Sequence, residues 1–144
     1  MVPRRTPPRS PASLSWEGGA APAFAVGDDG ELIEGARPGQ EAALRELKRG
    51  RSPPVATLDL HGLNAAEAEK KLVQFCDRQG GGRRRVVLVV HGRGVHSQGG
   101  RAVLRNEIAA WLSGPPLSHV VLCFATAKPR DGGAGALYVL LAPR

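Results

Sequence analysis

The amino-acid sequence predicts an α/β fold, a two-layer βαβαββ sandwich with a four-stranded mixed sheet, preceded by a partly disordered N-terminal extension. Three observations predict it. After residue 54, short runs of β-branched and aliphatic residues alternate with segments whose apolar residues recur at helical spacing. A capping-box pattern marks the start of the first of these helices. Glycine and proline gather between the segments and near the N-terminus, where they favour turns and irregular chain.

The first 54 residues are expected to form an extension rather than part of the domain at 55–144. Residues 1–23 are rich in Pro, Ser, Arg and Gly, a composition that cannot offset its ordering entropy by burial, and they are expected to be disordered. A Gly-Asp-Asp-Gly turn predicts at most a short hairpin over 24–35. A short helix is expected at about 39–49, with Gly50 after it, and it needs something to pack on because a helix of about 11 residues is marginal alone.

The domain itself begins with a strand at Val55–Leu60. Asn64 and Glu67 then form the capping box of a helix that ends near Gln79. The run VVLVV at 86–90 suits a strand covered on both faces. The remaining elements are a helix with Val103, Leu104, Ile108, Trp111 and Leu112 turned inward, a strand at 119–125 and a strand at 136–141. Two right-handed crossovers predict a mainly parallel sheet with the last strand as an antiparallel neighbour.

Charge is unevenly distributed along the chain. Residues 1–54 contain 8 Lys and Arg against 7 Asp and Glu, whereas residues 55–144 contain 12 against 6, so that most of the net charge of +7 belongs to the predicted domain. A compact basic domain attracts polyanions, most often nucleic acid. Charge that serves only solubility is the alternative, and composition does not choose between them.

Cysteine usage and hydropathy bear on the compartment. Cys76 and Cys123 lie among apolar residues without other ligands at metal-binding spacing, which favours reduced core packing over a disulfide. The N-terminus has no apolar run typical of a secretory signal, and no stretch approaches the roughly 18 apolar residues of a membrane span. A cytoplasmic protein with no membrane partner is the expectation.

Candidate catalytic residues lie where the first two strands end. Ligands of open α/β sheets bind beyond the carboxyl ends of the strands. Asp59 and His61 close the first strand and share a face because they are two residues apart. His91 closes the second, and Gly92 and Gly94 permit a tight turn there. If the two strands are neighbours, the carboxylate and both imidazoles come within about 10 Å of one another.

Taken singly, Asp59, His61 and His91 also suit ordinary structural positions. Together they suit acid–base chemistry, because imidazole titrates near neutral pH and a carboxylate can fix its tautomer. Asp59 would orient an imidazole, and the two histidines would exchange protons. Arginines and glycine amides that hold phosphates would direct this chemistry to phosphodiester cleavage. The expected nucleic-acid-binding residues are Arg83, Arg84, Arg85, Gly92, Arg93, Gly94, His96, Lys128 and Arg130.

Acidic residues are scarce in the predicted domain. Only Asp59 falls at the predicted site, so no carboxylate cluster supports a pair of Mg²⁺ ions. The sequence therefore predicts catalysis without a tightly bound metal and without any other cofactor, although a Mg²⁺ requirement is left open. For RNA, metal-free cleavage implies attack by the 2′-hydroxyl.

Three separated blocks, LDLHGLNAAEAEKKL, VVLVVHGRGVHSQGGRAVLRNEIAAWL and DGGAGALYVLL, resemble in order and spacing those of the Smr (small MutS-related) domain, over residues 55–144. The family's acidic-x-His element falls on Asp59 and His61, and its H/T-G-x-G element on His91–Gly94. The resemblance is to the stand-alone bacterial type, since a chain of this length has no room for an ATPase. It implies a βαβαββ fold similar to the C-terminal domain of a bacterial initiation factor, and endonuclease activity on DNA or RNA, with messenger cleavage at collided ribosomes in some members. Gly132, Gly133 and Gly135 match the final glycine block and are interpreted as shaping the loop beside the site.

Two main hypotheses of function follow. The first is an endonuclease that acts on RNA, including ribosome-associated messenger, or on structured DNA. The alternative is a nucleic-acid- or ribosome-binding module without turnover, and a structural interaction domain is a third reading. RNA and DNA are not distinguished, because aromatic residues make up only 4% and no stacking platform stands out. The N-terminal extension is the expected place for substrate choice.

Overall fold

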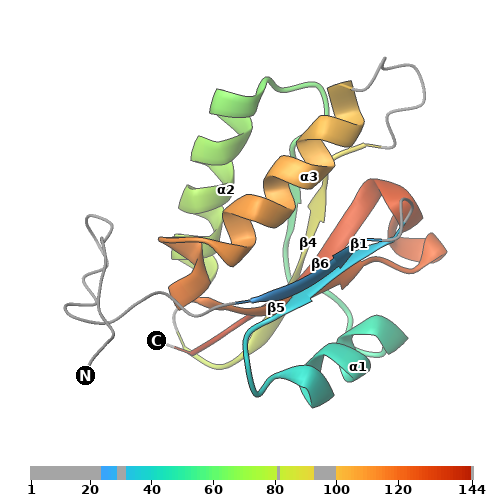
Figure 1. Ribbon diagram of the computed structural model, residues 1–144, viewed down its shortest axis with the longest axis vertical. Helices are drawn as coiled ribbons and strands as arrows, with labels where there is room; N and C mark the ends of the chain where they lie inside the picture. Colours follow the sequence, from blue (N-terminus) through green and yellow to red (C-terminus); the bar gives the residue numbers. More distant parts are fainter. Residues whose placement is uncertain (1–23, 29–31, 81, 93–99, 144) are drawn as a thin grey trace.

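The computed structural model describes residues 24–28, 32–80, 82–92 and 100–143, with side chains of the last segment from Leu104 onward. Its strands form one six-stranded mixed sheet with helices on both faces (Figure 1). α2 (Ala65–Gln79) and α3 (Gly100–Ser113) cover one face, and α1 (Glu41–Arg49) lies against the other. The chain thus forms three layers where the sequence predicted two, because α1 buries its apolar stripe on the sheet's second face.

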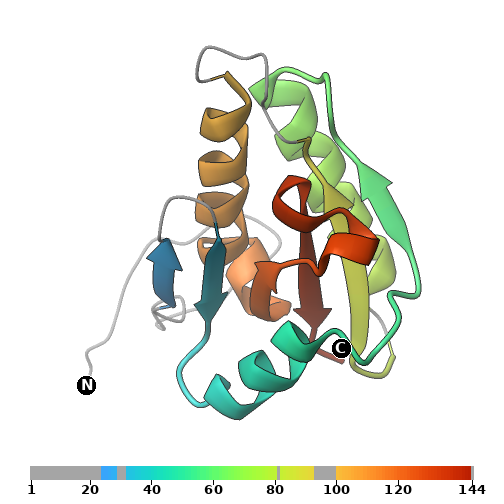
Figure 2. The same ribbon diagram turned by 90° about the vertical axis from the view of Figure 1, so that its right-hand side faces the viewer.

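The sheet has the strand order β1-β2-β5-β6-β4-β3, and Figure 2 shows β1 and β3 at its two ends. Within it, β3 pairs with β4 in parallel, whereas the other four pairings are antiparallel. The predictions of four strands and of a mainly parallel sheet are therefore wrong. β6 is antiparallel, as expected, but it lies between β4 and β5 and separates strands that would otherwise pair in parallel. The strands are β1 (Ala25–Asp28), β2 (Ile33–Ala36), β3 (Thr57–Asp59), β4 (Arg85–Val90), β5 (Val121–Thr126) and β6 (Ala136–Leu141).

The helices follow their local signals closely. Asn64 accepts a hydrogen bond from the Glu67 amide while the Glu67 side chain accepts one from the Asn64 amide, which confirms the capping box of α2. α1 ends at Gly50 in the left-handed conformation, as its glycine suggested. Three short 3₁₀ helices complete the secondary structure of the described residues, at Leu117–His119 (η1), Pro129–Asp131 (η2) and Gly133–Gly135 (η3). None of the helices in the described ranges is long and apolar enough to cross a membrane.

Two apolar clusters fill the spaces above and below the sheet. The larger lies between the sheet and α2/α3 and includes Leu72, Val89 and Ile108. The smaller lies on the α1 face and includes Leu47 and Tyr138. Because β4 alternates between the two clusters, its continuous apolar sequence is explained by burial on both sides.

Much of the expected extension belongs to the same body as the domain. The β1–β2 hairpin adds to the edge of β5, and Phe24 stacks on Phe124 with ring centroids 6.3 Å apart. The ring of Phe124 also lies over Gly35, where a Cβ would meet it at 2.5 Å. Residues 1–23, expected to be disordered, lie outside the described residues.

β3, β4 and β5 point in the same direction, which defines two edges of the sheet. We call the edge where they end the carboxyl edge; it holds Asp59, Val90 and Thr126. We call the other the amino edge, where β4 begins at Arg85 and β5 at Val121. β2 starts and β1 ends at the carboxyl edge, because they follow β5 in antiparallel order.

Candidate active site

Asp59 and His61 form a hydrogen-bonded pair at the carboxyl edge. Asp59 Oδ1 lies 2.6 Å from His61 Nδ1 and also accepts the His61 amide at 3.1 Å. The two bonds lower the pKa of the Asp59 carboxyl, the side-chain bond having the larger effect. Both side chains are more than half exposed, at 55% and 61%, whereas Leu60 between them is buried. The local sequence thus anchors the turn through Leu60 and presents the pair to solvent.

His91 is in a different environment. Its side chain is 1% exposed, and burial lowers its pKa to about 4, with the charge of Arg105 on α3 acting in the same direction. The imidazole is therefore neutral near pH 7. Its Nδ1 lies 2.8 Å from the carbonyl oxygen of Gly92, so Nδ1 carries the hydrogen and donates it. Nε2 is buried and has no hydrogen-bond partner among the described residues.

The two histidines face opposite sides of the sheet. Asp59 is in register with Val90, whose side chain packs on the α1 face, and His61 follows Asp59 on that face. His91 comes one residue after Val90, and strand alternation places it on the α2/α3 face together with Val89. β3 and β4 are neighbours, as the prediction required. No hydrogen bond joins the two imidazoles within the described part of the chain.

The final glycine block braces the turn after β4. The Gly135 carbonyl accepts hydrogen bonds from the amides of His91 at 2.9 Å and Gly92 at 3.0 Å. Gly92 has φ 93°, which only glycine adopts without strain. Its amide is thus already used, and it is not available for the phosphate contact that the sequence suggested. Arg93, Gly94 and His96 lie outside the described residues.

Arg83, Arg84 and Arg85 lie at the amino edge, away from the Asp59–His61 pair at the carboxyl edge. Arg85 opens β4 and His91 follows its end, a separation of about 20 Å along six residues of strand at about 3.3 Å each. Arg84 donates to Gln40 at 3.0 Å and Arg85 to Gln79 at 3.3 Å. Arg83 is exposed. The structure therefore places these arginines at the opposite edge of the sheet from Asp59 and His61, and their binding of phosphates stays a prediction.

Lys128 and Arg130 lie at the carboxyl edge, where the loop after β5 contacts the end of α1. Arg130 donates to the Gly50 carbonyl, and the Tyr138 hydroxyl donates to Asp131. The Lys128 amide in turn donates to the Tyr138 oxygen at 3.3 Å. Sequence reasoning missed Tyr138 and Asp131 because their link spans two elements, and neither residue type signals such a contact alone.

Metal binding finds no support in the described residues, where no three His, Cys, Asp or Glu side chains gather closely enough to hold an ion. Both cysteines are free and buried, and burial raises the pKa of the Cys76 thiol to about 12 and that of Cys123 to about 11. The prediction of catalysis without a bound metal stays a prediction.

Together these features define a small layered α/β domain with an exposed Asp–His pair and a glycine-braced turn at the carboxyl edge of its sheet. Residues 58–142 match the family model of the Smr domain, and the chain belongs to this family. The resemblance of its three sequence blocks is thereby confirmed.

Curated relatives carry two kinds of description. The chain is 32% identical over 102 residues to the probable DNA endonuclease SmrA of Escherichia coli (strain K12), covering 71% of this chain and 53% of the relative. It is 36% identical over 101 residues to the ribosome rescue factor SmrB of Aeromonas hydrophila, covering 68% and 51%. The chain spans about half the length of these relatives.

A solved structure has a similar fold. The crystal structure of YdaL, a stand-alone small MutS-related protein from Escherichia coli, matches with a TM-score of 0.61 and 28% identity, covering 78% of this chain and 85% of that one. This likeness covers more of the chain than residues 58–142, which are 85 of its 144 residues. Part of the expected extension therefore shares the fold.

Proposed function

We propose that this chain is an endonuclease that cleaves phosphodiester bonds of nucleic acid, with Asp59 and His61 as its acid–base pair. The observation that carries the proposal is the 2.6 Å contact between Asp59 Oδ1 and His61 Nδ1 on an exposed part of the carboxyl edge. Ligands of α/β sheets bind at this edge, and an Asp–His pair is the arrangement that prepares an imidazole to take up a proton.

The chemistry follows from the tautomer that Asp59 imposes. When Nδ1–H donates to the carboxylate, Nε2 has a free lone pair and accepts a proton from the attacking hydroxyl. On RNA this hydroxyl is the 2′-OH: a bond forms between O2′ and phosphorus, the bond from phosphorus to O5′ breaks, and the leaving oxygen takes a proton from solvent. Asp59, whose lowered pKa keeps it ionised, stabilises the imidazolium. On RNA the products are therefore a 2′,3′-cyclic phosphate and a 5′-hydroxyl.

His91 has a different role in this proposal from the one expected on the sequence. A neutral, buried imidazole cannot act as a general acid near pH 7, because it carries no proton to give beyond the one bound to Gly92. We assign it as a positioning residue that holds Gly92 in the turn after β4, directly before Arg93, the residue that the sequence analysis expects to bind a phosphate. Proton transfer is left to His61.

Nucleic acid is the proposed partner, and the names of the relatives support both DNA and ribosome-associated RNA. One relative is described as a probable DNA endonuclease and another as a ribosome rescue factor. RNA, including messenger on the ribosome, and structured DNA are both proposed substrates, and a cytoplasmic location suits either.

Substitution of the pair tests the proposal. His61→Ala is expected to lower the cleavage rate of labelled RNA or of nicked and branched DNA by at least about 100-fold, the usual contribution of a general base, with binding unchanged. Asp59→Asn is expected to lower it less, because Nε2 remains in place. Glu69→Gln on α2 removes one exposed negative charge, as Asp59→Asn does, and is its matched control. This variant should cleave at the wild-type rate. Unchanged cleavage by His61→Ala would disprove the assignment.

A nucleic-acid- or ribosome-binding module without turnover is the second candidate. It is favoured by the arginines at the amino edge, which could bind phosphates without any reaction. The wild-type chain would then bind labelled RNA and DNA and leave both intact, and His61→Ala would bind equally well.

A further inference from the structure

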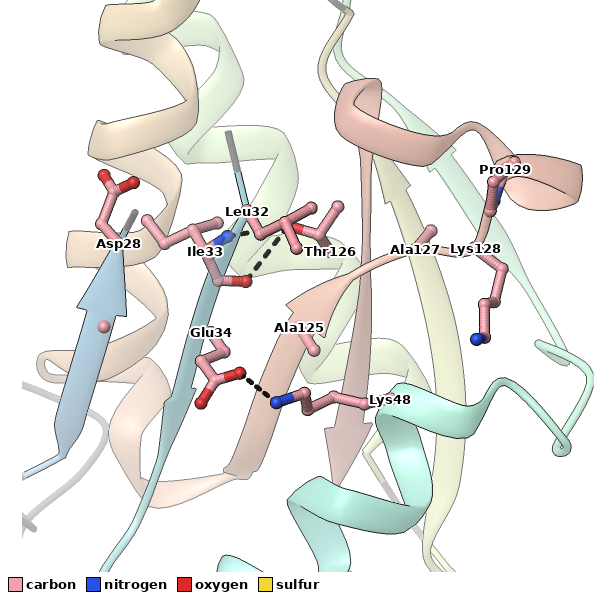
Figure 3. Close-up of a pocket in the computed structure, with 11 residues that line it drawn as sticks. Asp28, Leu32, Ile33, Glu34, Lys48, Ala125, Thr126, Ala127, Lys128 and Pro129 are labelled. Carbon is pink, nitrogen blue, oxygen red and sulfur yellow. Dashed lines mark hydrogen bonds and ion pairs between the residues drawn. The ribbon is translucent and has the colours of Figure 1, made fainter. Parts of the chain in front are cut away.

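A pocket of about 540 Å³ opens at the carboxyl edge between the end of α1, the β1–β2 hairpin and the loop after β5 (Figure 3). This volume falls within the range of about 300–1,000 Å³ typical of small-molecule sites. Aliphatic groups of Leu32, Ala125 and Ala127 form part of its lining, and Glu34, Lys48 and Lys128 also contribute.

The charged residues of the pocket lining differ in their ion pairing. Glu34 is paired with Lys48 at 2.7 Å, and the other lining carboxylate, Asp28, is paired with Arg105 at 3.2 Å. For Lys128, no carboxylate lies within 4.0 Å in the part of the chain that the structure describes. A largely apolar cavity with an ammonium group that no described carboxylate pairs suits a ligand that has a flat apolar part and one negative group.

Lys128 is held in place by its surroundings. Its backbone amide donates to the Tyr138 oxygen, and its carbonyl accepts the amides of Asp131 at 2.8 Å and Gly133 at 3.0 Å. Its aliphatic stem lies against Gly50, where a Cβ would come within 2.7 Å of Lys128 Cγ. The stem is thus fixed by contacts formed before any ligand arrives.

The pocket shares an edge and a face with the Asp59–His61 pair. Ala125 and Ala127 belong to the apolar cluster on the α1 face, the face of Asp59. From β5 to β3 there are three strand spacings, through β6 and β4, or about 14 Å at about 4.8 Å each. A strand of nucleic acid that follows this edge past Asp59 and His61 therefore reaches the pocket within a few nucleotides.

We propose that this pocket binds one unpaired nucleotide of the substrate strand, with the base against the aliphatic wall and a phosphate at Lys128. The inference rests on the proposed function and adds a specificity site to it. Glu34, Lys48 and the hairpin residues precede residues 58–142, so the site combines the segment that matches the family model with the part of the chain that precedes it. Such a site selects strands that are unpaired near the cleaved bond, because a paired base cannot enter.

Methyl NMR on the full chain tests this directly. Uridine and adenosine 5′-monophosphates are expected to shift the methyl signals of Leu32, Ala125 and Ala127, the nucleosides alone to shift them with lower affinity, and inorganic phosphate alone to leave them in place. Lys128→Met, which keeps the aliphatic stem, should weaken the monophosphates about tenfold and the nucleosides little. Lys71→Met, an identical change on exposed α2, is the matched control and should have no effect.

A second pair of variants tests the apolar wall. Leu32→Ser should weaken nucleosides and monophosphates alike, whereas Val55→Ser, another exposed apolar residue outside the pocket, should not. The proposal is overturned if saturating monophosphate leaves the three methyl groups unshifted, if phosphate alone binds as well as the monophosphates, or if the control variants weaken binding equally. Cleavage by the wild-type chain is measured separately: cleavage without binding in the pocket overturns this inference alone, and binding without cleavage overturns the endonuclease alone.

Discussion

At the scale of single residues, burial determines the behaviour of His91. An unfolded histidine takes up its proton near pH 6.5, whereas folded His91 does so only near pH 4. Between these values the unfolded state binds more protons, so the folded state loses stability as the pH falls from 6.5 to 4, by about 3 kcal/mol in all. His91→Gln should remove this loss, and urea denaturation of both proteins at pH 7 and pH 4.5 measures it. Equal losses in the two proteins would show that His91 is not the group responsible.

The sequence allowed the contact between Asp59 and His61 to be predicted, but not the environment of His91. Residues two apart on a strand share a face, and this rule predicted that Asp59 and His61 would lie together. The strand in fact ends at Asp59, and the two residues are held together in the following turn by the hydrogen bonds of the Asp59 carboxylate to the His61 amide and ring. The burial of His91 was not predictable in the same way. It follows VVLVV, which is apolar on both faces, so the pattern does not reveal that the next side chain is also buried. The proton-transfer role expected for His91 was therefore predicted without knowledge that its side chain is buried.

At the scale of elements, the end of α1 is joined to the loop that follows β5. Gly50 has φ 67°, and an added Cβ would meet Lys128 Cγ at 2.7 Å and the Tyr138 hydroxyl at 3.0 Å. Gly50→Ala is expected to lower the free energy of unfolding by about 1–2 kcal/mol for the left-handed backbone and by a further amount for the contact. Gly39→Ala is the matched control, since φ is 90° there but nothing lies within 4 Å. Chemical denaturation should show a clearly larger loss for Gly50→Ala, and equal losses would exclude the contact.

Elements with local signals were predicted well, and those that depend on distant pairing were not. α1 was expected as a marginal helix in need of a partner, and it has one in the second face of the sheet. The hairpin at residues 24–35 was foreseen at most as an isolated pair of strands. The pairing of β2 with β5 brings Gly35 against Phe124, a residue 89 positions away. The composition near the turn does not indicate that contact.

At the scale of the whole molecule, positive charge lies at both edges of the sheet. The amino edge carries Arg83 and Arg84, and the carboxyl edge carries Lys128. If a polyanion contacts both, Arg83→Ala with Arg84→Ala should reduce the slope of log affinity against log salt by about 1.4 to 1.8, the value for two lost phosphate contacts. Fluorescence anisotropy with a labelled oligonucleotide at several salt concentrations measures this slope, with Lys70→Ala and Lys71→Ala on α2 as the matched pair. If both double variants reduced the slope equally, the effect would come from the total charge of the protein rather than from contacts of Arg83 and Arg84 with phosphates.

The overall order of elements was accessible from periodicity, but the position of the last strand was not. Nothing in residues 136–141 distinguishes an edge neighbour from a strand inserted between β4 and β5. The loop at residues 127–135 allows the insertion, since it returns the chain antiparallel to β5 through two short 3₁₀ turns. The family resemblance implied the βαβαββ order, and the three-layer arrangement came from the N-terminal part that it did not cover.

The central place of β6 also sets the order in which this molecule can be completed during synthesis. Until residues 136–141 have been made, β1, β2 and β5 on one side and β3 and β4 on the other are two separate fragments of sheet, each with an unpaired edge. The turn after β4 also depends on residues made at about this point, because the Gly135 carbonyl accepts the hydrogen bonds of the His91 and Gly92 amides. A growing chain therefore joins the two fragments of its sheet only once residues 136–141 have been made, whereas the Asp59–His61 contact depends on residues that are made much earlier.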